Sequence, residues 1–202
     1  MLVKVCGMRE AENVAEVARL GISMMGFIFF DRSARFVVDD APATPRGVER
    51  VGVFVNSSKE YILEIANRHK LTHIQLHGAE SVDLCREIRE HGFSVIKAIS
   101  IASVADVEQT KIYDGEVDYL LFDTKCEGHG GSGRCFDWGV LNSYSGGTKF
   151  LLSGGIDETM ADDVSKISHP QLVGVDLNSR FEDSPALKNV DKLKAFIGKL
   201  NN

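Results

Sequence analysis

The sequence lacks long hydrophobic runs and any excess of positive charge. None of its apolar runs approaches the roughly 18 residues that a membrane-spanning helix needs. It has 23 basic and 29 acidic side chains, a net charge of −6. A protein that binds nucleic acid through its phosphates needs a basic surface, which this balance does not supply. We therefore expect neither a membrane nor a nucleic-acid partner.

Cysteine is also scarce, and its spacing is uninformative. The four cysteines form no Cys-x-x-Cys pair and have no zinc-ligand spacing with histidine, so no metal site is expected. The first residues turn polar at Arg9-Glu10, without the long apolar region of a signal peptide. Reduced thiols and a cytoplasmic location are the simplest expectation.

The chain alternates between short β-rich runs and amphipathic stretches. The runs recur about every 25 residues, the size of one strand–helix unit. They lie at residues 2–5, 24–30, 51–55, 73–76, 93–99, 117–122, 149–152 and 172–177. The stretches between them have helical periodicity, as where Ile62, Ile65 and Ala66 share one face after Ser57-Ser58, where a serine supplies the N-cap.

Eight such units are compatible with a doubly wound sheet or with a closed (β/α)8 TIM barrel. The count and the even spacing favour the barrel. We predict a single α/β domain over residues 1–202, with short loops because the chain is short for this fold. The second helix is the weakest, since Pro42 and Pro45 interrupt residues 39–46 and leave only a short helix that ends near Arg50.

In such a barrel the active site lies at the carboxyl ends of the strands. Ser153-Gly154-Gly155 follows the seventh strand, and Asn178-Ser179 follows the eighth. Loops at these two places often hold phosphate, because glycine lets backbone N–H groups approach an anion and a helix amino terminus attracts it. We predict a phosphate site here. The alternative is a tight turn into a helix capped by Asp157.

Residues 128–134 form a second glycine-rich segment after the sixth strand. A nucleotide-binding P-loop requires Lys-Ser or Lys-Thr where this chain has Arg134-Cys135. We expect instead a lid whose amides, around Gly131 and Ser132, face a phosphate. The alternative is a surface loop without a ligand.

A thiol and a carboxyl group end the first and sixth strands. Strand alternation places Lys4 and Cys6 on one face of the first strand, and Leu121 and Asp123 on one face of the sixth. If both faces point inward, an acid and a base lie across the barrel mouth and could shuttle protons on a sugar. The alternatives are a small buried hydrophobic role for Cys6, and a helix cap or ion pair for Asp123.

Arg35 lies in the loop after the second strand. Its planar guanidinium could bind a substrate carboxylate through two hydrogen bonds. Most arginines in loops are simply solvated, so the residue by itself leaves both roles open.

Several motifs along the whole chain occur together in one enzyme family. They are Lys4-Val5-Cys6-Gly7-Met8, Ser33-Ala34-Arg35-Phe36-Val37, Gln75-Leu76-His77-Gly78, Leu121-Phe122-Asp123 followed by Gly130-Gly131-Ser132-Gly133 and Phe136-Asp137-Trp138, Ser153-Gly154-Gly155-Ile156, and Gly174-Val175-Asp176. In order and spacing they resemble phosphoribosylanthranilate isomerase, an enzyme of tryptophan biosynthesis.

The resemblance implies an Amadori rearrangement without metal or organic cofactor. Asp123 would protonate the furanose ring oxygen, Cys6 would remove the proton from C2 of the sugar, and Arg35 would hold the anthranilate carboxylate. The other substrate contacts would come from His77, Gly131, Ser132, Gly154, Gly155, Asp176, Asn178 and Ser179. The implied partner is the small phosphosugar–anthranilate substrate, and the implied assembly is a monomer or a homodimer.

This chemistry sets a condition on protonation. Asp123 must be at least partly protonated and Cys6 partly ionised, whereas reference pKa values of about 3.9 and 8.5 put both groups on the wrong side near neutral pH. Either the site shifts these values, or a small correctly protonated fraction carries the turnover.

The chain departs from the family pattern in two places. Asn178-Ser179-Arg180 stands where Ser-Ser-Gly is common, and Ala34 stands where proline is usual. Either backbone amides bind the phosphate while Arg180 points into solvent, or its guanidinium contacts the phosphate directly. We favour the first, because amides at a helix amino terminus already suit an anion.

Three other functions compete with this interpretation. A histidine-pathway sugar isomerase would resemble this chain but have aspartate in both catalytic positions, which Cys6 contradicts. Indole-glycerol-phosphate synthase should have a catalytic lysine cluster and an amino-terminal extension, whereas this chain begins at its first strand. A non-catalytic barrel that binds phosphosugars would bind product analogues without turnover.

Overall fold

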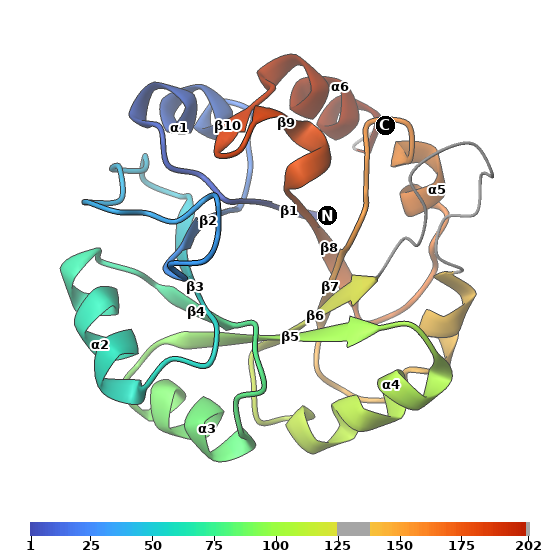
Figure 1. Cartoon of the computed structure of the whole chain (residues 1–202). Helices are drawn as coiled ribbons and strands as arrows, with labels where there is room; N and C mark the ends of the chain where they lie inside the picture. Colours follow the sequence, from blue (N-terminus) through green and yellow to red (C-terminus); the bar gives the residue numbers. More distant parts are fainter. Residues whose placement is uncertain (125–137, 201–202) are drawn as a thin grey trace.

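The computed structural model describes residues 1–124 and 138–200. Eight parallel strands close into a barrel in which each strand pairs with its neighbours in the sequence and β1 pairs with β8 (Figure 1). The strands are β1 Leu2–Cys6, β2 Met24–Ile28, β3 Glu49–Phe54, β4 His73–Leu76, β5 Ser94–Ile101, β6 Tyr119–Thr124, β7 Phe150–Ser153 and β8 Leu172–Leu177. The predicted (β/α)8 architecture is confirmed, and the doubly wound alternative is wrong.

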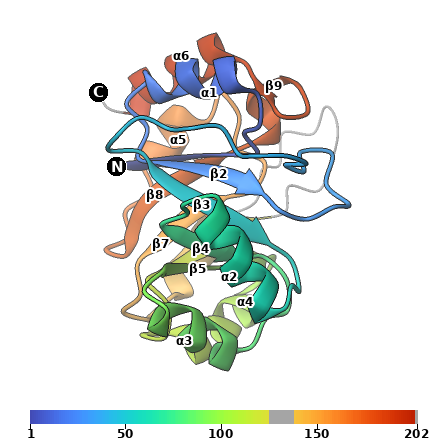
Figure 2. The same cartoon turned by 90° about the vertical axis from the view of Figure 1, so that its left-hand side faces the viewer.

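Helices surround the strands on the outside of the barrel (Figures 1 and 2). They are α1 Ala11–Ala18, α2 Lys59–Arg68, α3 Val82–Glu90, α4 Val104–Gln109, α5 Ala161–Ser165 and α6 Val190–Leu200, with 3-10 turns η1 Thr110–Tyr113, η2 Trp138–Ser143 and η3 Ser179–Phe181. Ser58 caps α2 as predicted, since its hydroxyl accepts the Tyr61 N–H at 3.3 Å. A hairpin of β9 Glu182–Ser184 and β10 Leu187–Lys188 precedes α6.

The predicted second helix is wrong. Residues 29–48 contain no helix, and Arg50 lies in β3. The two prolines cannot donate backbone hydrogen bonds, and the Arg50 side chain stabilises the irregular segment by donating to the Pro42 carbonyl at 2.6 Å. The cap that we considered at Asp157 is also wrong: its carboxylate accepts the Thr159 N–H at 2.9 Å, and α5 begins after Met160.

The barrel has two apolar layers. The larger one fills the space between strands and helices, and a smaller one fills the barrel interior. The interior layer consists of Met24, Val51, Ile96, Ala98, Leu121 and Leu151. Because Leu121 points inward, Asp123, two residues further along β6, lies on the same inward face at the carboxyl end of the strand. The filled interior leaves the carboxyl ends as the place for a site.

Among the helices of the described residues, none has the length and apolar character required to cross a membrane.

Candidate active site

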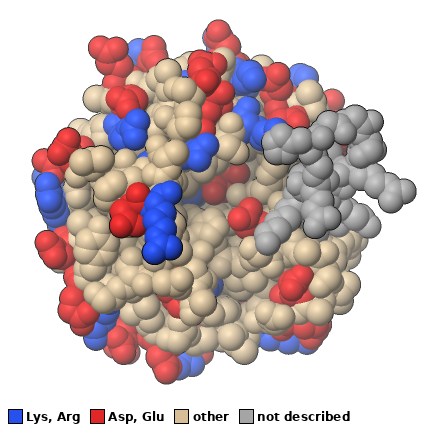
Figure 3. Space-filling model, in the orientation of Figure 1, with Lys and Arg blue, Asp and Glu red and all other residues tan. Residues whose placement is uncertain are grey.

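A cavity opens at the carboxyl ends of the strands, and Figure 3 looks onto this face of the molecule. Eight of the predicted site residues line it: Cys6, His77, Asp123, Gly154, Gly155, Asp176, Asn178 and Ser179. Gln75 and Arg180 line it as well. Arg35 is not among the described residues at its wall, and the predicted contacts Gly131 and Ser132 lie outside the described residues.

Cys6 ends β1 and is buried, with 3% of its surface exposed. Its neighbour across the β1–β2 pair is Gly26, and a Cβ atom there would lie 2.7 Å from the Cys6 sulfur. Glycine at this position therefore leaves the room that the thiol occupies. Burial raises the pKa of the Cys6 thiol, and the positive charges of Lys4 and Lys188 oppose this rise only in part.

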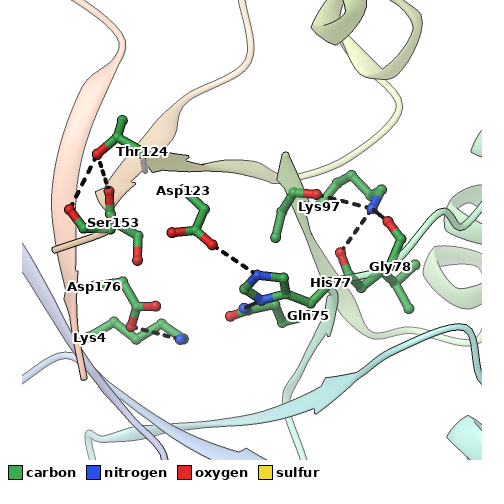
Figure 4. Close-up of polar contacts among 12 residues, drawn as sticks. Lys4, Gln75, His77, Gly78, Lys97, Asp123, Thr124, Ser153 and Asp176 are labelled. Atoms are coloured by element: carbon green, nitrogen blue, oxygen red, sulfur yellow. Dashed lines mark hydrogen bonds and ion pairs between the residues drawn. The ribbon is translucent and has the colours of Figure 1, made fainter. Parts of the chain in front are cut away.

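Lys4 and Asp176 form a buried ion pair inside the barrel, with 2.8 Å between Nζ and Oδ1 (Figure 4). The two residues face each other across the β1–β8 pair. Burial alone would lower the pKa of Lys4, but attraction to Asp176 and Cys6 raises it above its ordinary value. A permanent ammonium group thus lies on the same face of β1 as Cys6, where it favours the thiolate.

Asp123 lies beside His77, with 3.3 Å between Oδ2 and Nε2. The other ring nitrogen of His77, Nδ1, lies 2.8 Å from Nε2 of Gln75 (Figure 4). About a third of the side-chain surface of both Asp123 and His77 is exposed. The carboxyl group can therefore reach a ligand in the cavity while the imidazole contacts it from the side.

The loops after β7 and β8 border the cavity together. Gly154 has φ +91°, and a Cβ atom there would lie 1.9 Å from the Thr124 carbonyl oxygen, so only glycine fits. Thr124 in turn donates its hydroxyl proton to the Ser153 carbonyl at 2.8 Å. After β8, Asn178 precedes the 3-10 turn η3.

Arg180 is exposed within η3 and also lines the cavity. Within the described ranges it makes no ion pair with Glu182 or Asp183. Glu182 is occupied instead by Arg35 and Lys188.

Arg35 is held at the edge of the site by Glu182. Its Nε lies 2.9 Å and 3.0 Å from the two carboxylate oxygens, and Nη2 lies 2.5 Å from Oε2. Burial alone would raise the pKa of Glu182, but hydrogen bonds from Arg35 and Lys188 lower it below its ordinary value. The carboxylate therefore stays ionised. A Cβ atom at Gly7, where φ is +77°, would lie 2.6 Å from Cδ of Arg35, so this glycine allows the close approach.

Sequence reasoning assigned no role to Lys4, Gln75, Glu182 or Lys188. Lys4 and Gln75 could have been found from the sequence, because strand alternation places Lys4 on the same face as Cys6 and Gln75 on the same face as His77. No sequence pattern indicated the ion pairs of Glu182 with Arg35 and Lys188, because these depend on the packing of the β9–β10 hairpin. Over residues 1–124 and 138–200, no group of three or more histidine, cysteine or carboxylate side chains could hold a metal ion.

Comparison with known proteins identifies the family. Residues 3–199 match the family model described as N-(5'-phosphoribosyl)anthranilate (PRA) isomerase. The chain belongs to this family. It is 50% identical to the N-(5'-phosphoribosyl)anthranilate isomerase of Parabacteroides distasonis over 98% of this chain and 92% of that protein.

Solved structures of N-(5'-phosphoribosyl)anthranilate isomerases have the same fold. The enzyme from Thermotoga maritima superposes with a TM-score of 0.85 at 32% identity, covering 100% of this chain and 98% of that one. Another, in complex with reduced 1-(o-carboxyphenylamino)-1-deoxyribulose 5-phosphate, gives a TM-score of 0.83 at 30% identity with the same coverage. The predicted family and the predicted isomerase of tryptophan biosynthesis are confirmed.

Proposed function

We propose that this cavity binds N-(5-phosphoribosyl)anthranilate and that Asp123 and Cys6 carry its rearrangement to 1-(2-carboxyphenylamino)-1-deoxyribulose 5-phosphate. The observation that supports these roles is that the carboxyl group and the thiol border one cavity from β6 and β1. The glycine loop after β7 and the turn after β8 border the same cavity and would take the phosphate.

The first step opens the sugar ring. Asp123 donates its proton to the ring oxygen, the bond between C1 and that oxygen breaks, and the nitrogen lone pair forms the C1–N double bond. The products of this step are a ring-opened hydroxyl group, a protonated Schiff base and the Asp123 carboxylate. The exposed third of the Asp123 side chain makes the carboxyl group reachable for a sugar in the cavity.

The second step removes the proton from C2. The Cys6 thiolate takes this proton, the C–H electron pair forms the C1–C2 double bond, and the Schiff-base nitrogen recovers its lone pair. The resulting enolamine then tautomerises to the ketone. Burial raises the pKa of Cys6, which makes the thiolate rarer but each thiolate a stronger base. The positive charge of Lys4 favours the thiolate form of Cys6. The cationic Schiff base, once formed, favours the thiolate further.

Arg35 is the proposed partner of the anthranilate carboxylate. Its Nη1 has no hydrogen-bond partner among the described residues, whereas Nε and Nη2 donate to Glu182. A substrate carboxylate can therefore bind at Nη1 or compete with Glu182 for Nη2. Competition keeps the guanidinium paired in both states, so no charge is left buried and unpaired.

We expect Arg35→Ala to weaken binding of carboxylate-bearing ligands. A charge-assisted hydrogen bond contributes about 1.5–3 kcal/mol, which corresponds to about 10–150-fold in dissociation constant. Fluorescence titration with the reduced product, and with an analogue that lacks the carboxylate, measures this effect. The second ligand should bind both proteins equally. Equal weakening of both ligands would mean that Arg35 shapes the loop instead.

Replacing Arg180 with glycine should change phosphate binding little. The guanidinium is exposed at the cavity rim, where solvent and salt screen its charge, and backbone amides already suit the anion. We expect the dissociation constant of a phosphate-bearing ligand to change by less than about fivefold. A rise of tenfold or more that is absent for the dephosphorylated analogue would show a direct contact.

Turnover tests the proposed function as a whole. A fluorescence assay that follows loss of the anthranilate-type substrate should show conversion by the unaltered protein, and loss of conversion with Cys6→Ser. Binding of the reduced product without any turnover would instead favour a barrel that only binds phosphosugars. Whether the protein is a monomer or a homodimer stays a prediction.

A further inference from the structure

Gln75 is a buried polar residue with half of its amide unpaired. Its side chain is on the inward face of β4, and only 1% of the residue is exposed. Nε2 lies 2.8 Å from Nδ1 of His77, whereas Oε1 has no hydrogen-bond partner in the described part of the chain. A buried carbonyl oxygen without a partner is costly, so it calls for an explanation.

The surroundings of Gln75 explain why nothing fixes the orientation of the amide. On the neighbouring strands its register partners are Val53 on β3 and Ile96 on β5. Both side chains are apolar and buried, and neither can bind an amide oxygen or nitrogen. The His77 ring is therefore the only described hydrogen-bond partner of the amide, whichever half faces it.

The two amide orientations correspond to two proton counts on His77 and Asp123. When the amide nitrogen faces His77, Nδ1 must accept, so the ring proton is on Nε2 and is donated to an ionised Asp123 carboxylate. When the amide oxygen faces His77, Nδ1 carries a proton. Nε2 and the Asp123 carboxyl group can then share one further proton between them. Each orientation leaves half of the amide unpaired, so neither is favoured by a second contact.

We propose that Gln75 is a positioning residue whose amide orientation sets the tautomer of His77, and thereby whether Nε2 donates to an Asp123 carboxylate or accepts from an Asp123 carboxyl group. This inference rests on the proposed role of Asp123 as the acid. When the amide oxygen accepts from Nδ1, Nε2 can accept the proton of the Asp123 carboxyl group, which keeps Asp123 in the acid form that ring opening needs. Asp123 gives this proton to the sugar ring oxygen, the Nδ1 proton stays on the ring, and the next proton is taken up by the Asp123 carboxylate.

Other charged groups surround this pair. Cys6 from β1 and Asp176 from β8 border the same cavity, with Arg180 at its rim, and Lys4 is paired with Asp176. Lys97 of β5 donates to the Gly78 carbonyl at 2.7 Å and forms a buried ion pair with Glu80 at 3.0 Å. The Lys4–Asp176 and Lys97–Glu80 pairs each have no net charge. Neither pair therefore favours one orientation of the Gln75 amide over the other.

The first test reads the His77 ring directly. Histidine ¹⁵N NMR of the unliganded protein, with His77→Asn to assign its signals, should show the neutral ring protonated on Nε2 at high pH. In Gln75→Glu the new carboxylate only accepts, so the neutral ring should be protonated on Nδ1. The pH midpoint of the His77 signals should rise by about one unit, a tenfold change in proton affinity. An unchanged tautomer and midpoint would overturn the proposal.

The second test is kinetic and uses a matched packing control. Gln75→Met keeps the side-chain length but offers no partner to Nδ1, so kcat should fall about tenfold or more while KM changes less than about threefold. Ile96→Val perturbs the same apolar surroundings without touching the amide and should keep kcat. Equal kcat in Gln75→Met and the unaltered protein would overturn the proposal.

These measurements separate two failures. If Asp123→Asn keeps its activity, the proposed acid is wrong, even though the His77 tautomer still responds to Gln75→Glu. If Asp123→Asn is inactive but the His77 signals ignore Gln75→Glu, the acid is right and the role of Gln75 is wrong. Circular-dichroism melting of each variant shows whether lost activity comes from lost folding.

Discussion

Asp123→Asn is expected to lower kcat by about 10²–10⁴-fold, the usual contribution of a general acid. The amide has nearly the same shape as the carboxyl group and can still contact His77, but it cannot deliver a proton to the ring oxygen. Binding should therefore survive. Steady-state fluorescence of substrate loss measures kcat, and titration with the reduced product measures affinity.

A matched control makes the Asp123 result specific. Asp162→Asn introduces the same chemical change at an exposed position of α5, away from the residues that line the cavity, and should leave kcat unaltered. If Asp123→Asn stays within a few-fold of the unaltered protein, Asp123 is not the acid. A loss of affinity for the reduced product comparable with the loss of kcat would instead indicate a binding role.

Cys6→Ser is expected to lower kcat by a similar factor, about 10²–10⁴-fold. A serine hydroxyl is far less acidic than a thiol, so the ionised form that could take the C2 proton is almost absent at neutral pH. Because burial raises the pKa of Cys6, the thiolate fraction, and with it alkylation, should increase as the pH rises above the ordinary thiol range. The reduced product should protect the thiol.

The alkylation experiment must show which cysteine is modified, because the chain has four. Cys126→Ala and Cys135→Ala together leave only Cys6 and Cys85. Burial raises the pKa of Cys85 to about 11, so Cys85 should react slowly at lower pH. Mass spectrometry then locates the adduct, and the fluorescence assay reports the activity. Full activity of protein that is stoichiometrically alkylated at Cys6 would exclude this residue as the base.

The repeated pattern of the sequence was enough to predict the barrel. Strand alternation is a local property of the backbone, and it placed Cys6 and Asp123 on inward faces that the structure confirms. Glycine positions were equally readable, since Gly154 adopts a backbone conformation that favours glycine. The second helix failed because the contact that stabilises its segment, from Arg50 to the Pro42 carbonyl, is made by a side chain and not by a helical repeat.

The sequence alone determined the fold, the family motifs and the candidate acid and base, because these follow from periodicity and short-range order. Only the tertiary structure decided how the site is charged. Lys4 pairs with Asp176, 172 positions away, and Arg35 pairs with Glu182, 147 positions away. Burial and such distant partners set whether Cys6 is a thiol or a thiolate and where Arg35 is held. They depend on packing in three dimensions, which no local pattern records.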